Sequence, residues 1–426
     1  MGISNTIFIV LFIGAVVWFA FNVKKIISNI QLGRKVDRSD NAGLRWKTMI
    51  KVALGQSKMT ARPVAGLLHI VVYAGFVIIN LEMLEIVIDG ISGSHRVFEP
   101  VLGGLYSAFI NVFEVLAFGV LIGCVIFFIR RNILRIPRFH KAEMKTWPKS
   151  DANIILVTEI LLMTAFLTMN ASDTHTSGNF LVSSGLKGFL PTDENSLHLI
   201  ERSCWWFHIL GVLGFLNYLP YSKHFHILLA FPATYYSNLL PKGQFTNMHA
   251  VTNEVKLMFD PNADPYAAAP ETDPNAEVVR FGAKEVNDLT WKNLMDSYSC
   301  TECGRCSSEC PANQTGKLLS PRKIMMDTRD RLEEFGANKG VDDGKSLLHD
   351  YITPEELRAC TTCNACTQAC PINLDPLSII MEMRRYLIME ESNAPQEWNG
   401  MATNIENNGA PWQFAQADRL NWATEE

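Results

Sequence analysis

Two copies of one cysteine motif constrain this chain more than any other feature of its sequence. The motif has the spacing Cys-x-x-Cys-x-x-Cys-x-x-x-Cys-Pro and occurs at residues 300–311 and again at 360–371. Eight of the ten cysteines lie in these two runs. Such clustering is typical of metal sites in a reducing compartment and argues against a disulfide framework.

The spacing within each motif suits iron–sulfur clusters. Three thiolates at this spacing can bind three corners of a 4Fe–4S cubane, while the fourth cysteine, set by the following proline, reaches the neighbouring cluster. The predicted ligands are Cys300, Cys303, Cys306 and Cys370 for the first cluster, and Cys360, Cys363, Cys366 and Cys310 for the second. Zinc is the alternative, because Cys-x-x-Cys pairs also form tetrahedral zinc sites. Zinc needs no third and fourth cysteine in each run, so we favour iron and sulfide.

The first 240 residues are much more apolar than the rest of the chain. Five apolar segments are long enough to cross a bilayer as helices, and they lie at about 5–23, 64–88, 104–129, 152–171 and 203–231. Pro220 interrupts the last one. A signal peptide is the alternative for the first, but its positive residues would precede the apolar core, whereas Lys24 and Lys25 follow it. We therefore expect a mainly α fold, with a five-helix membrane domain over residues 1–240.

The loops between these segments differ in positive charge. The stretches 24–62 and 130–151 carry ten and seven Lys and Arg residues. By contrast, the other two loops carry only Arg96 and Lys187. Positive loops are retained on the cytoplasmic side of a membrane. This predicts an N-terminus outside and a polar C-terminal half in the cytoplasm, as five crossings require.

The polar half divides into three regions. Residues 241–280 are predicted to be a linker, since 260–280 is rich in Pro, Ala and Asp and has no hydrophobic period. Residues 281–392 are predicted to form a helical domain around the two cysteine motifs. Residues 393–426 form a tail, whose Trp412 and Trp422 would suit docking to a partner. A tail without function is the alternative.

Three helices of this domain have recognisable starts. Each begins with a capping residue followed by proline at the first helical position, as in Ser320-Pro321, Thr353-Pro354 and Asp375-Pro376. The last of them is expected to reach about Glu391. The helical domain is therefore larger than a compact ferredoxin built from two cysteine loops alone.

Three histidines in the apolar segments suggest haem ligands. A histidine at bilayer depth is costly and marks a functional hypothesis. His69 lies in the second segment, and His208 and His226 lie 18 residues apart in the fifth. On one continuous helix this separation is five turns, or about 27 Å along one face, which suits two stacked haems with axial imidazoles. His224 could replace His226, and structural histidines bonded to backbone or Ser/Thr groups are the alternative.

Glu82, Glu85 and Asp89 share one helix face at the outer end of the second segment. Quinone chemistry couples electrons to protons, so a carboxylate beside a quinone is useful. This predicts a quinone or proton site at these three residues. Alternatively, they face water or pair with Arg96. Two isolated carboxylates inside the third and fourth segments are further candidates for such a role: Glu114 and Glu159.

The membrane half resembles the five-helix cytochrome b subunit of respiratory nitrate reductase and its relatives in membrane-bound heterodisulfide reductase. The likeness rests on the crossing count, the external N-terminus, a histidine in the second helix, and the histidine pair in the fifth. The motif Pro-x-Ser-Lys-x-x-His also precedes the last ligand. The resemblance implies a haem b held by His69 and His226 near the cytoplasm, and an outer haem bound by His208.

The chain departs from that pattern at one place. The nitrate-reductase relative has a second histidine in its second helix, where this chain has Ile79 and Asn80. The second ligand of the outer haem is therefore unassigned, with His95, His175 and His198 as weak candidates. One haem is expected, and two are compatible with the sequence.

The cysteine-rich half resembles the α-helical ferredoxins of heterodisulfide reductase subunits and of fumarate reductase iron subunits. The sequence from residue 407 onward resembles the segment that leads into a Cys-Cys-Gly catalytic domain in fused oxidoreductases of the heterodisulfide-reductase and glycolate-oxidase kind. No Cys-Cys-Gly motif occurs in the 426 residues. The resemblance therefore implies a separately encoded Cys-Cys-Gly iron–sulfur subunit as a partner.

These features together predict a membrane-bound electron-transfer subunit of a respiratory quinone oxidoreductase in the bacterial inner membrane, with menaquinone favoured. An electron-transfer flavoprotein or a flavin dehydrogenase is a further expected partner. No catalytic triad, phosphate loop or nucleotide signature occurs, so no site for a soluble substrate is expected. A net charge of −5 gives no attraction to nucleic acid. The alternative is a haem-less, membrane-anchored iron–sulfur redox sensor or structural anchor.

Overall fold

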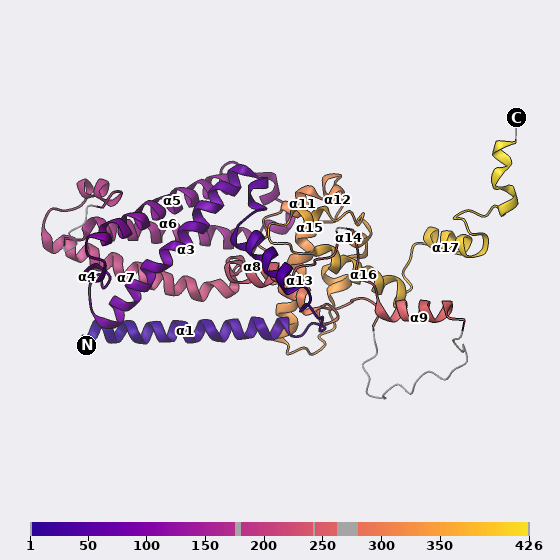
Figure 1. Ribbon diagram of the computed structural model, residues 1–426, viewed down its shortest axis with the longest axis horizontal. Coiled ribbons are helices and arrows are strands. Elements are labelled where there is room, and N and C mark those ends of the chain that lie inside the picture. Colours follow the sequence, from indigo (N-terminus) through magenta and orange to yellow (C-terminus); the bar gives the residue numbers. More distant parts are fainter. Residues whose placement is uncertain (1, 175–179, 242, 262–279, 425–426) are drawn as a thin grey trace.

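The computed structural model describes residues 2–174, 180–241, 243–261 and 280–424, and within these ranges the chain is helical without β-strands. Figure 1 shows an elongated molecule, with long helices at one end, short helices in the middle and the C-terminus at the far end. The predicted mainly α fold is confirmed. His175 lies outside the described residues.

Among the described residues, five helices are long and apolar enough to cross a membrane. They are α1 (Ile3–Ile30), α3 (Pro63–Ser92), α5 (Tyr106–Asn132), α6 (Trp147–Ser172) and α7 (Glu194–Tyr218). They alternate in direction, so the N-terminus and the cysteine-rich half lie at opposite ends of the bundle (Figure 1). The predicted number of apolar helices is confirmed.

Short elements connect the long helices. Those before the break in the fifth predicted segment are α2 (Ala42–Met49), η1 (Ile50–Leu54), η2 (Met59–Ala61), α4 (Glu99–Leu102), η3 (Gly103–Leu105), η4 (Pro137–Phe139), η5 (Ala142–Met144) and η6 (Ser183–Phe189). Several of them lie in the two positively charged loops. These loops therefore have defined structure and are able to form specific contacts.

The fifth predicted segment is not one helix. After α7 ends, two short 3₁₀ turns, η7 (Leu219–Tyr221) and η8 (Lys223–Phe225), precede α8 (His226–Tyr235). Proline lacks the N–H that would continue the helical ladder. Ser222 is extended, with φ of −115° and ψ of 149°, and its side chain accepts a hydrogen bond from the His224 N–H. The prediction that one continuous helix carries both His208 and His226 was therefore wrong. Their separation is not five helical turns along one face.

The long helices pack closely through small residues. A Cβ on Gly211 of α7 would lie 2.5 Å from the Leu162 side chain of α6, so only glycine allows this approach. In membrane bundles, small residues of this kind let helix backbones come together. Ile110, Phe113 and Phe166 fill the space between the helices and are almost fully buried.

The cysteine-rich half is made of short helices. They are α9 (His249–Phe259), η9 (Val286–Asp288), α10 (Trp291–Ser299), α11 (Arg305–Glu309), α12 (Pro311–Gln314), α13 (Pro321–Ala337), η10 (Leu347–Tyr351), α14 (Pro354–Arg358), α15 (Ala365–Ala369), α16 (Pro376–Met389), α17 (Gln396–Asn408) and η11 (Gln416–Ala423). Three of the helices begin where the sequence predicts. The side chains of Ser320, Thr353 and Asp375 accept hydrogen bonds from the first turns of α13, α14 and α16.

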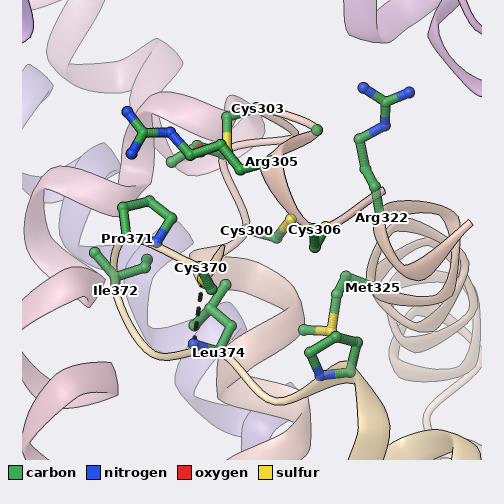
Figure 2. Close-up of a pocket in the computed structure, with 13 residues that line it drawn as sticks. Cys300, Cys303, Arg305, Cys306, Arg322, Met325, Cys370, Pro371, Ile372 and Leu374 are labelled. Atoms are coloured by element: carbon green, nitrogen blue, oxygen red, sulfur yellow. Dashed lines mark hydrogen bonds between the residues drawn. The ribbon is translucent and has the colours of Figure 1, made fainter. Parts of the chain in front are cut away.

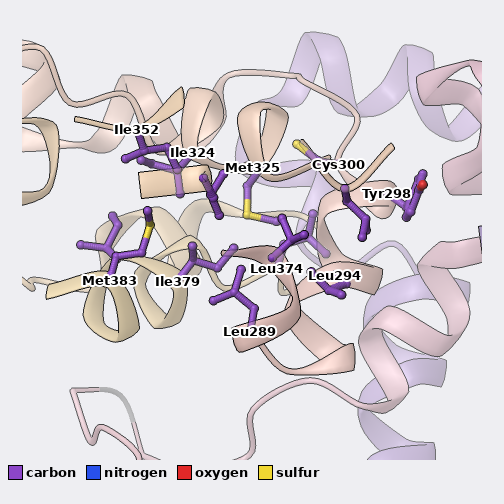
Figure 3. Close-up of a cluster of buried hydrophobic side chains, with 14 of the residues drawn as sticks. Leu289, Leu294, Tyr298, Cys300, Ile324, Met325, Ile352, Leu374, Ile379 and Met383 are labelled. Carbon is purple, nitrogen blue, oxygen red and sulfur yellow. The ribbon is translucent and has the colours of Figure 1, made fainter. Parts of the chain in front are cut away.

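An apolar core holds these short helices together. Figure 3 shows Leu294, Ile324, Ile379 and Met383 from α10, α13 and α16 pointing into one cluster. All four are fully buried. Cys300 joins the edge of the same cluster. The core therefore anchors the backbone that carries the first cysteine motif.

Two segments differ in character from the packed domain. The helix α9 lies within the predicted linker 241–280, whose Pro-rich part at 262–279 is outside the described residues. Beyond α16, the tail with α17 and η11 extends away from the body (Figure 1). Trp412 and Trp422 are exposed there by 50% and 76%. The tail thus presents aromatic side chains to solvent.

The C-terminal end of α1 connects the two halves. α1 continues to Ile30, beyond the predicted end at residue 23, and packs against α10 and α13. Asn29 donates a buried hydrogen bond of 2.9 Å to the Tyr298 hydroxyl. A Cβ on Gly336 of α13 would overlap the Asn29 side chain. The first membrane helix is therefore part of the core of the cysteine-rich half.

Gly336→Ala is expected to loosen this contact. The added methyl group forces Asn29 to rotate away and leaves the buried Tyr298 hydroxyl without its partner, at a cost of about 1–3 kcal/mol. Limited proteolysis of the purified variant in detergent should cut the chain near the packing contact of α1 with α10 and α13 faster than it cuts the wild type. Gly400→Ala, on exposed α17 with open space around its Cβ, is the matched control and should leave the rate unchanged. Equal rates for the two variants would contradict this packing.

Candidate functional site

The two cysteine motifs form the same backbone loop. In the first motif, Glu302 and Gly304 have positive φ values of 54° and 70°. At the equivalent positions of the second motif, Thr362 and Asn364 have values of 56° and 65°. A short helix, α11 or α15, follows each loop. Left-handed backbone at two fixed positions turns successive cysteine side chains toward one centre.

The first three cysteines meet the last cysteine of the second motif. Cys300, Cys303, Cys306 and Cys370 line one pocket. Figure 2 shows these thiols around the cavity. The backbone N–H of Leu374 donates to the Cys370 sulfur at 3.3 Å. Burial raises the pKa of both Cys300 and Cys370 to about 12. The structure thus brings together all four residues predicted for the first cluster.

The second set of cysteines lies at a more open position. Cys360 is close enough to Cys310 and Cys363 for their charges to interact, and its sulfur accepts from the Thr362 N–H at 3.4 Å. Cys366 is buried, whereas Cys363 is exposed. Within the described ranges, no three His, Cys, Asp or Glu side chains surround a single-ion position. The nearness of Cys310 to Cys360 is consistent with crossed ligation.

Residues of the membrane half reach the first site. Lys58 Nζ donates to the carbonyl oxygen of Cys370 at 2.9 Å and to Asn373 Oδ1 at 2.7 Å. Arg305 donates in turn to the Lys58 carbonyl at 3.1 Å. Arg322 lines the cavity and bonds the carbonyl of Arg138 at 2.6 Å. Both positively charged loops therefore hold the first cysteine site.

A buried charge network forms the other side of this contact. Glu302, between two cluster cysteines, forms an ion pair with Lys223, and Arg329 binds its other oxygen at 2.9 Å. Burial alone would raise the pKa of Glu302, but the charges of Lys223 and Arg329 outweigh it and hold the pKa below its usual value. The Glu302 carboxylate is therefore charged, and it joins the cysteine loop to the end of the fifth membrane segment.

Three histidines gather beside this network. The His224 and His226 rings lie 5.5 Å apart, and His69 is close enough to His226 and Arg305 for electrostatic interaction. In the described part of the chain, the buried Nδ1 of His69 has no hydrogen-bond partner. His226 Nδ1 lies 3.0 Å from the Lys223 carbonyl. A backbone carbonyl at one ring nitrogen orients the other toward a metal, and His226 has this arrangement.

His208 has a similar local arrangement, deeper in the bundle. Its ring is buried, and Nδ1 lies 3.0 Å from the Leu162 carbonyl. Of the weak candidates for a second outer ligand, His95 lies 3.5 Å from Asp173 and His198 is exposed. The pairing of His208 with a second imidazole remains a prediction.

The three outer carboxylates have different surroundings. Glu85 accepts from the Tyr106 hydroxyl and the Phe98 N–H, both at 2.9 Å. Asp89 accepts from the N–H of Arg96 at 2.8 Å and so orders the following loop. Glu82 is 1% exposed, and among the described residues neither of its oxygens has a hydrogen-bond partner. Its carboxylate lies 3.7 Å from Arg96. Of the three, Glu82 is the carboxylate that accepts no hydrogen bond from the described residues.

Arg96 is the centre of a polar cluster at this end of the bundle. It binds Asn170 at 2.8 Å and Asp173 at 3.1 Å, besides its contact with Glu82. Glu114 accepts from Asn170 at 3.2 Å. Sequence reasoning anticipated a pairing with Arg96 but not Asn170 or Asp173, because neither stands out by spacing or motif.

The cysteine loops also contain residues that sequence reasoning missed. Glu302 and Arg305 are unlike the residues at the equivalent positions of the second motif, Thr362 and Ala365. That difference between two otherwise matching repeats is a signal available from the sequence. It identifies which motif faces the membrane half.

Comparison with protein families agrees with this geometry. The family model of the 4Fe-4S dicluster domain matches residues 299–374, which include all eight motif cysteines. The chain carries a 4Fe–4S dicluster domain. The preference for iron–sulfur over zinc is therefore supported by a second, independent line of evidence. No solved structure matches the chain.

The curated relatives are iron–sulfur oxidoreductases and subunits of such complexes. The probable iron-sulfur-binding oxidoreductase FadF of Bacillus subtilis is 28% identical over 99% of this chain and 61% of its own length. The EtfAB:quinone oxidoreductase of Syntrophomonas wolfei is 26% identical over 92% of this chain and 55% of its own. This chain thus spans roughly three-fifths of the length of these relatives.

A third relative matches the dicluster half. It is a component of the ferredoxin/F(420)H(2)-dependent CoB-CoM heterodisulfide reductase of Methanosarcina acetivorans, and it is 31% identical over 27% of this chain and 60% of its own length. The predicted relationship to heterodisulfide-reductase subunits is confirmed, and an electron-transfer role within an oxidoreductase complex is consistent with all three relatives.

Serine variants of the cysteines should fall into two groups. Cys300→Ser and Cys370→Ser are expected to perturb one cluster, and Cys360→Ser and Cys310→Ser the other, because each pair is predicted to share a site. Anaerobic purification, iron and sulfide analysis and electron paramagnetic resonance (EPR) of the reduced protein would measure this. Each variant should lose about half of the iron, since one of two equal clusters is removed.

Cys124→Ser is the matched control, since this buried thiol lies in α5 outside both motifs. It should retain the full iron content. If Cys370→Ser instead changed the same spectrum as Cys360→Ser, ligation would be uncrossed.

Proposed function

We propose that this chain is the membrane-bound electron-transfer subunit of a respiratory quinone oxidoreductase, with menaquinone as the favoured quinone. The observation that carries the proposal is the position of the first cysteine site, whose Arg305 is close enough to His69 for their charges to interact. A cluster site next to a pair of buried imidazoles is the arrangement that electron transfer between a soluble domain and a membrane requires. The similarity to a quinone oxidoreductase supports the same function.

The eight motif cysteines would hold two 4Fe–4S clusters, in the crossed sets given above. Each cluster, like the haem, supplies reversible one-electron chemistry when bound. The chain's own contribution is to exclude water with the apolar lining of the first cavity. The Leu374 and Thr362 N–H groups also donate to the sulfurs of Cys370 and Cys360, and such bonds would stabilise negative charge on these ligands.

His69 and His226 would hold haem b as axial ligands at the end of the bundle that faces the dicluster domain. His208 would bind a second, outer haem. Support comes from the unpartnered Nδ1 of His69 and from the backbone carbonyls that orient His226 and His208. His224 is the competing ligand, because its ring lies beside that of His226.

We place the dicluster domain in the cytoplasm and the N-terminus outside, in the bacterial inner membrane. The two positively charged loops lie at the end of the bundle that contacts the dicluster domain, as Lys58 and Arg138 show. Positive loops face the cytoplasm. The domain bound to them is then cytoplasmic, where thiols and iron–sulfur clusters are kept reduced.

Glu82 is the best candidate for proton exchange with a quinone. Its carboxylate is buried at the outer end of α3, lies beside Arg96 and retains free hydrogen-bonding capacity. Glu85 and Asp89, which the sequence groups with it, already hold surrounding groups and would instead order the site.

A partner would bind on the side of the second cluster site, where Cys363 is exposed. A Cys-Cys-Gly iron–sulfur subunit or a flavoprotein would suit this position, and the name of the Syntrophomonas relative points to an electron-transfer flavoprotein. Trp412 and Trp422 on the exposed tail would extend the contact. The rival function is a redox sensor or structural anchor without haem.

Optical spectra distinguish the two functions. The reduced-minus-oxidised spectrum of the purified protein should show a b-type α-band. His69→Ala and His226→Ala should each remove the part of this band that comes from the haem near the dicluster domain, because a haem ligand is lost. His224→Ala should retain that part of the band. His140→Ala, in an exposed loop position, is the control. A wild-type protein with iron and sulfide but no α-band would favour the sensor or anchor.

Glu82→Gln should slow electron exchange with quinone. Loss of a general acid–base group costs about 10²–10⁴ in rate, so reoxidation of the pre-reduced protein by a menaquinone analogue should fall about 100-fold. Stopped-flow absorbance would follow the reaction, with the α-band unchanged. Glu194→Gln, at the exposed start of α7, is the control. A normal rate in Glu82→Gln would exclude Glu82 from the proton path.

A further inference from the structure

The two cluster sites have different surroundings despite their shared backbone. Between the first and third cysteines of the motifs, the residues that differ are Glu302, Gly304 and Arg305 in the first, and Thr362, Asn364 and Ala365 in the second. In the first motif this loop faces the membrane half: a Cβ on Gly304 would lie 3.5 Å from the Cβ of Arg138. The replacement of side chains within one loop geometry gives the two sites unequal electrostatic environments.

Four cationic side chains surround the first site: Lys58, Arg138, Arg305 and Arg322. Lys58 donates to the carbonyl oxygen of Cys370, and Arg305 donates to the carbonyl oxygen of Lys58. Arg322 is paired with Glu143 at 2.7 Å. Arg138 interacts electrostatically with Cys303, and its Nε and Nη1 atoms have no hydrogen-bond partner among the described residues. Glu302 is the negative residue of the same loop, and its charge is paired with Lys223 and Arg329, so the charges around the site still sum to a positive value.

The second site has a balanced environment. Arg384 donates to the Cys360 carbonyl at 2.5 Å and contributes one positive charge. Asp375 lies close enough to Cys366 for electrostatic interaction and contributes one negative charge. Cys363 is exposed, so water screens the charges around it. The protein therefore offers this site little net stabilisation of added negative charge.

The geometry points to a built-in difference in reduction potential: we propose that Lys58, Arg138, Arg305 and Arg322 raise the potential of the first cluster above that of the second. Reduction adds one electron and no proton, so the extra negative charge is stabilised by nearby cations. Burial of the first site opposes this effect, because a buried cluster loses hydration of its reduced form. The cations share the same burial, however, and are therefore poorly screened.

The size of the effect favours the cations. At an effective dielectric constant of about 20, one unit charge at about 8 Å shifts an equilibrium by more than tenfold. Lys58 contacts the backbone of a cluster ligand directly, so its charge lies within that range. Several such charges outweigh a moderate burial penalty.

This inference rests on the proposed function and gives the relay a direction. The second site is open to a soluble partner, and the first lies beside His69. A higher potential at the first site favours electron flow from the partner side toward the membrane. The direction of electron flow is then set by the charged residues around the first cluster, and not by the cysteines that bind the clusters.

EPR-monitored redox titration of the full-length protein tests the proposal. The spectra of Cys370→Ser and Cys310→Ser identify which signal belongs to which site. In the wild type, the first cluster should be reduced at the higher potential. In Lys58→Met, the equilibrium constant for reduction of the first cluster should fall at least tenfold, which lowers its midpoint potential by about 59 mV for one electron. The midpoint potential of the second cluster should not change. Lys58→Arg should restore the midpoint of the first cluster.

Two further variants keep the test decisive. Lys51→Met removes an exposed charge from the same loop and should shift neither midpoint. Arg138→Met removes a charge near Cys303 without breaking a side-chain hydrogen bond described above, and should lower the first midpoint even if Lys58→Met fails to fold. A first midpoint at or below the second, or equal shifts of both in Arg138→Met, would overturn the proposal. These titrations need no haem, so an absent α-band would defeat the proposed function and leave this result readable.

Discussion

The ion pair between Lys223 and Glu302 is the interaction on which the arrangement of the two halves depends. Both side chains are buried, and each is held by a second group: Asp151 lies 3.7 Å from Lys223, and Arg329 lies 2.9 Å from Glu302. Buried ion pairs add little net stability, but removal of one partner costs about 3–5 kcal/mol, because a charge is left without compensation. The pair therefore acts mainly through orientation. It aligns the loop of the first cysteine motif with the break that precedes His226.

The same positive loops serve topology, docking and electrostatics. Lys and Arg residues in 24–62 and 130–151 are expected to keep these loops on one side of the membrane. Lys58 and Arg138 from those loops also contact the dicluster domain near its first cluster site. A soluble domain that binds charged loops gains specificity through paired, desolvated groups, since a wrong orientation would leave them unpaired. This explains how polar side chains, without a large apolar interface of their own, position a redox site beside the bundle.

The duplicated motif shows how one local structure serves two environments. Positive φ at Glu302 and Thr362 gives both loops the same shape, although only glycine adopts that conformation without cost. The surrounding contacts over-determine it: Glu302 is held by its ion pairs, while the Thr362 N–H bonds the Cys360 sulfur. Equivalent loops thus become an inner and an outer site through neighbours from distant parts of the chain.

The sequence by itself determined the five apolar helices, the iron–sulfur motifs and three helix starts, because each depends on residues close together in the chain. Crossed pairing of Cys370 with the first motif was also predictable, since the repeat imposes it. The sequence showed an interruption at Pro220, but not that two 3₁₀ turns and an extended Ser222 would separate His208 and His226 into two helices, since this depends on whether capping groups such as Ser222 are available. Only the tertiary structure brought Lys58 to Cys370 and Lys223 to Glu302. It also gave Glu85 hydrogen-bond donors that Glu82 lacks among the described residues. Those contacts join residues from different helices and loops, and no local pattern encodes a distance between segments that meet only in the folded chain.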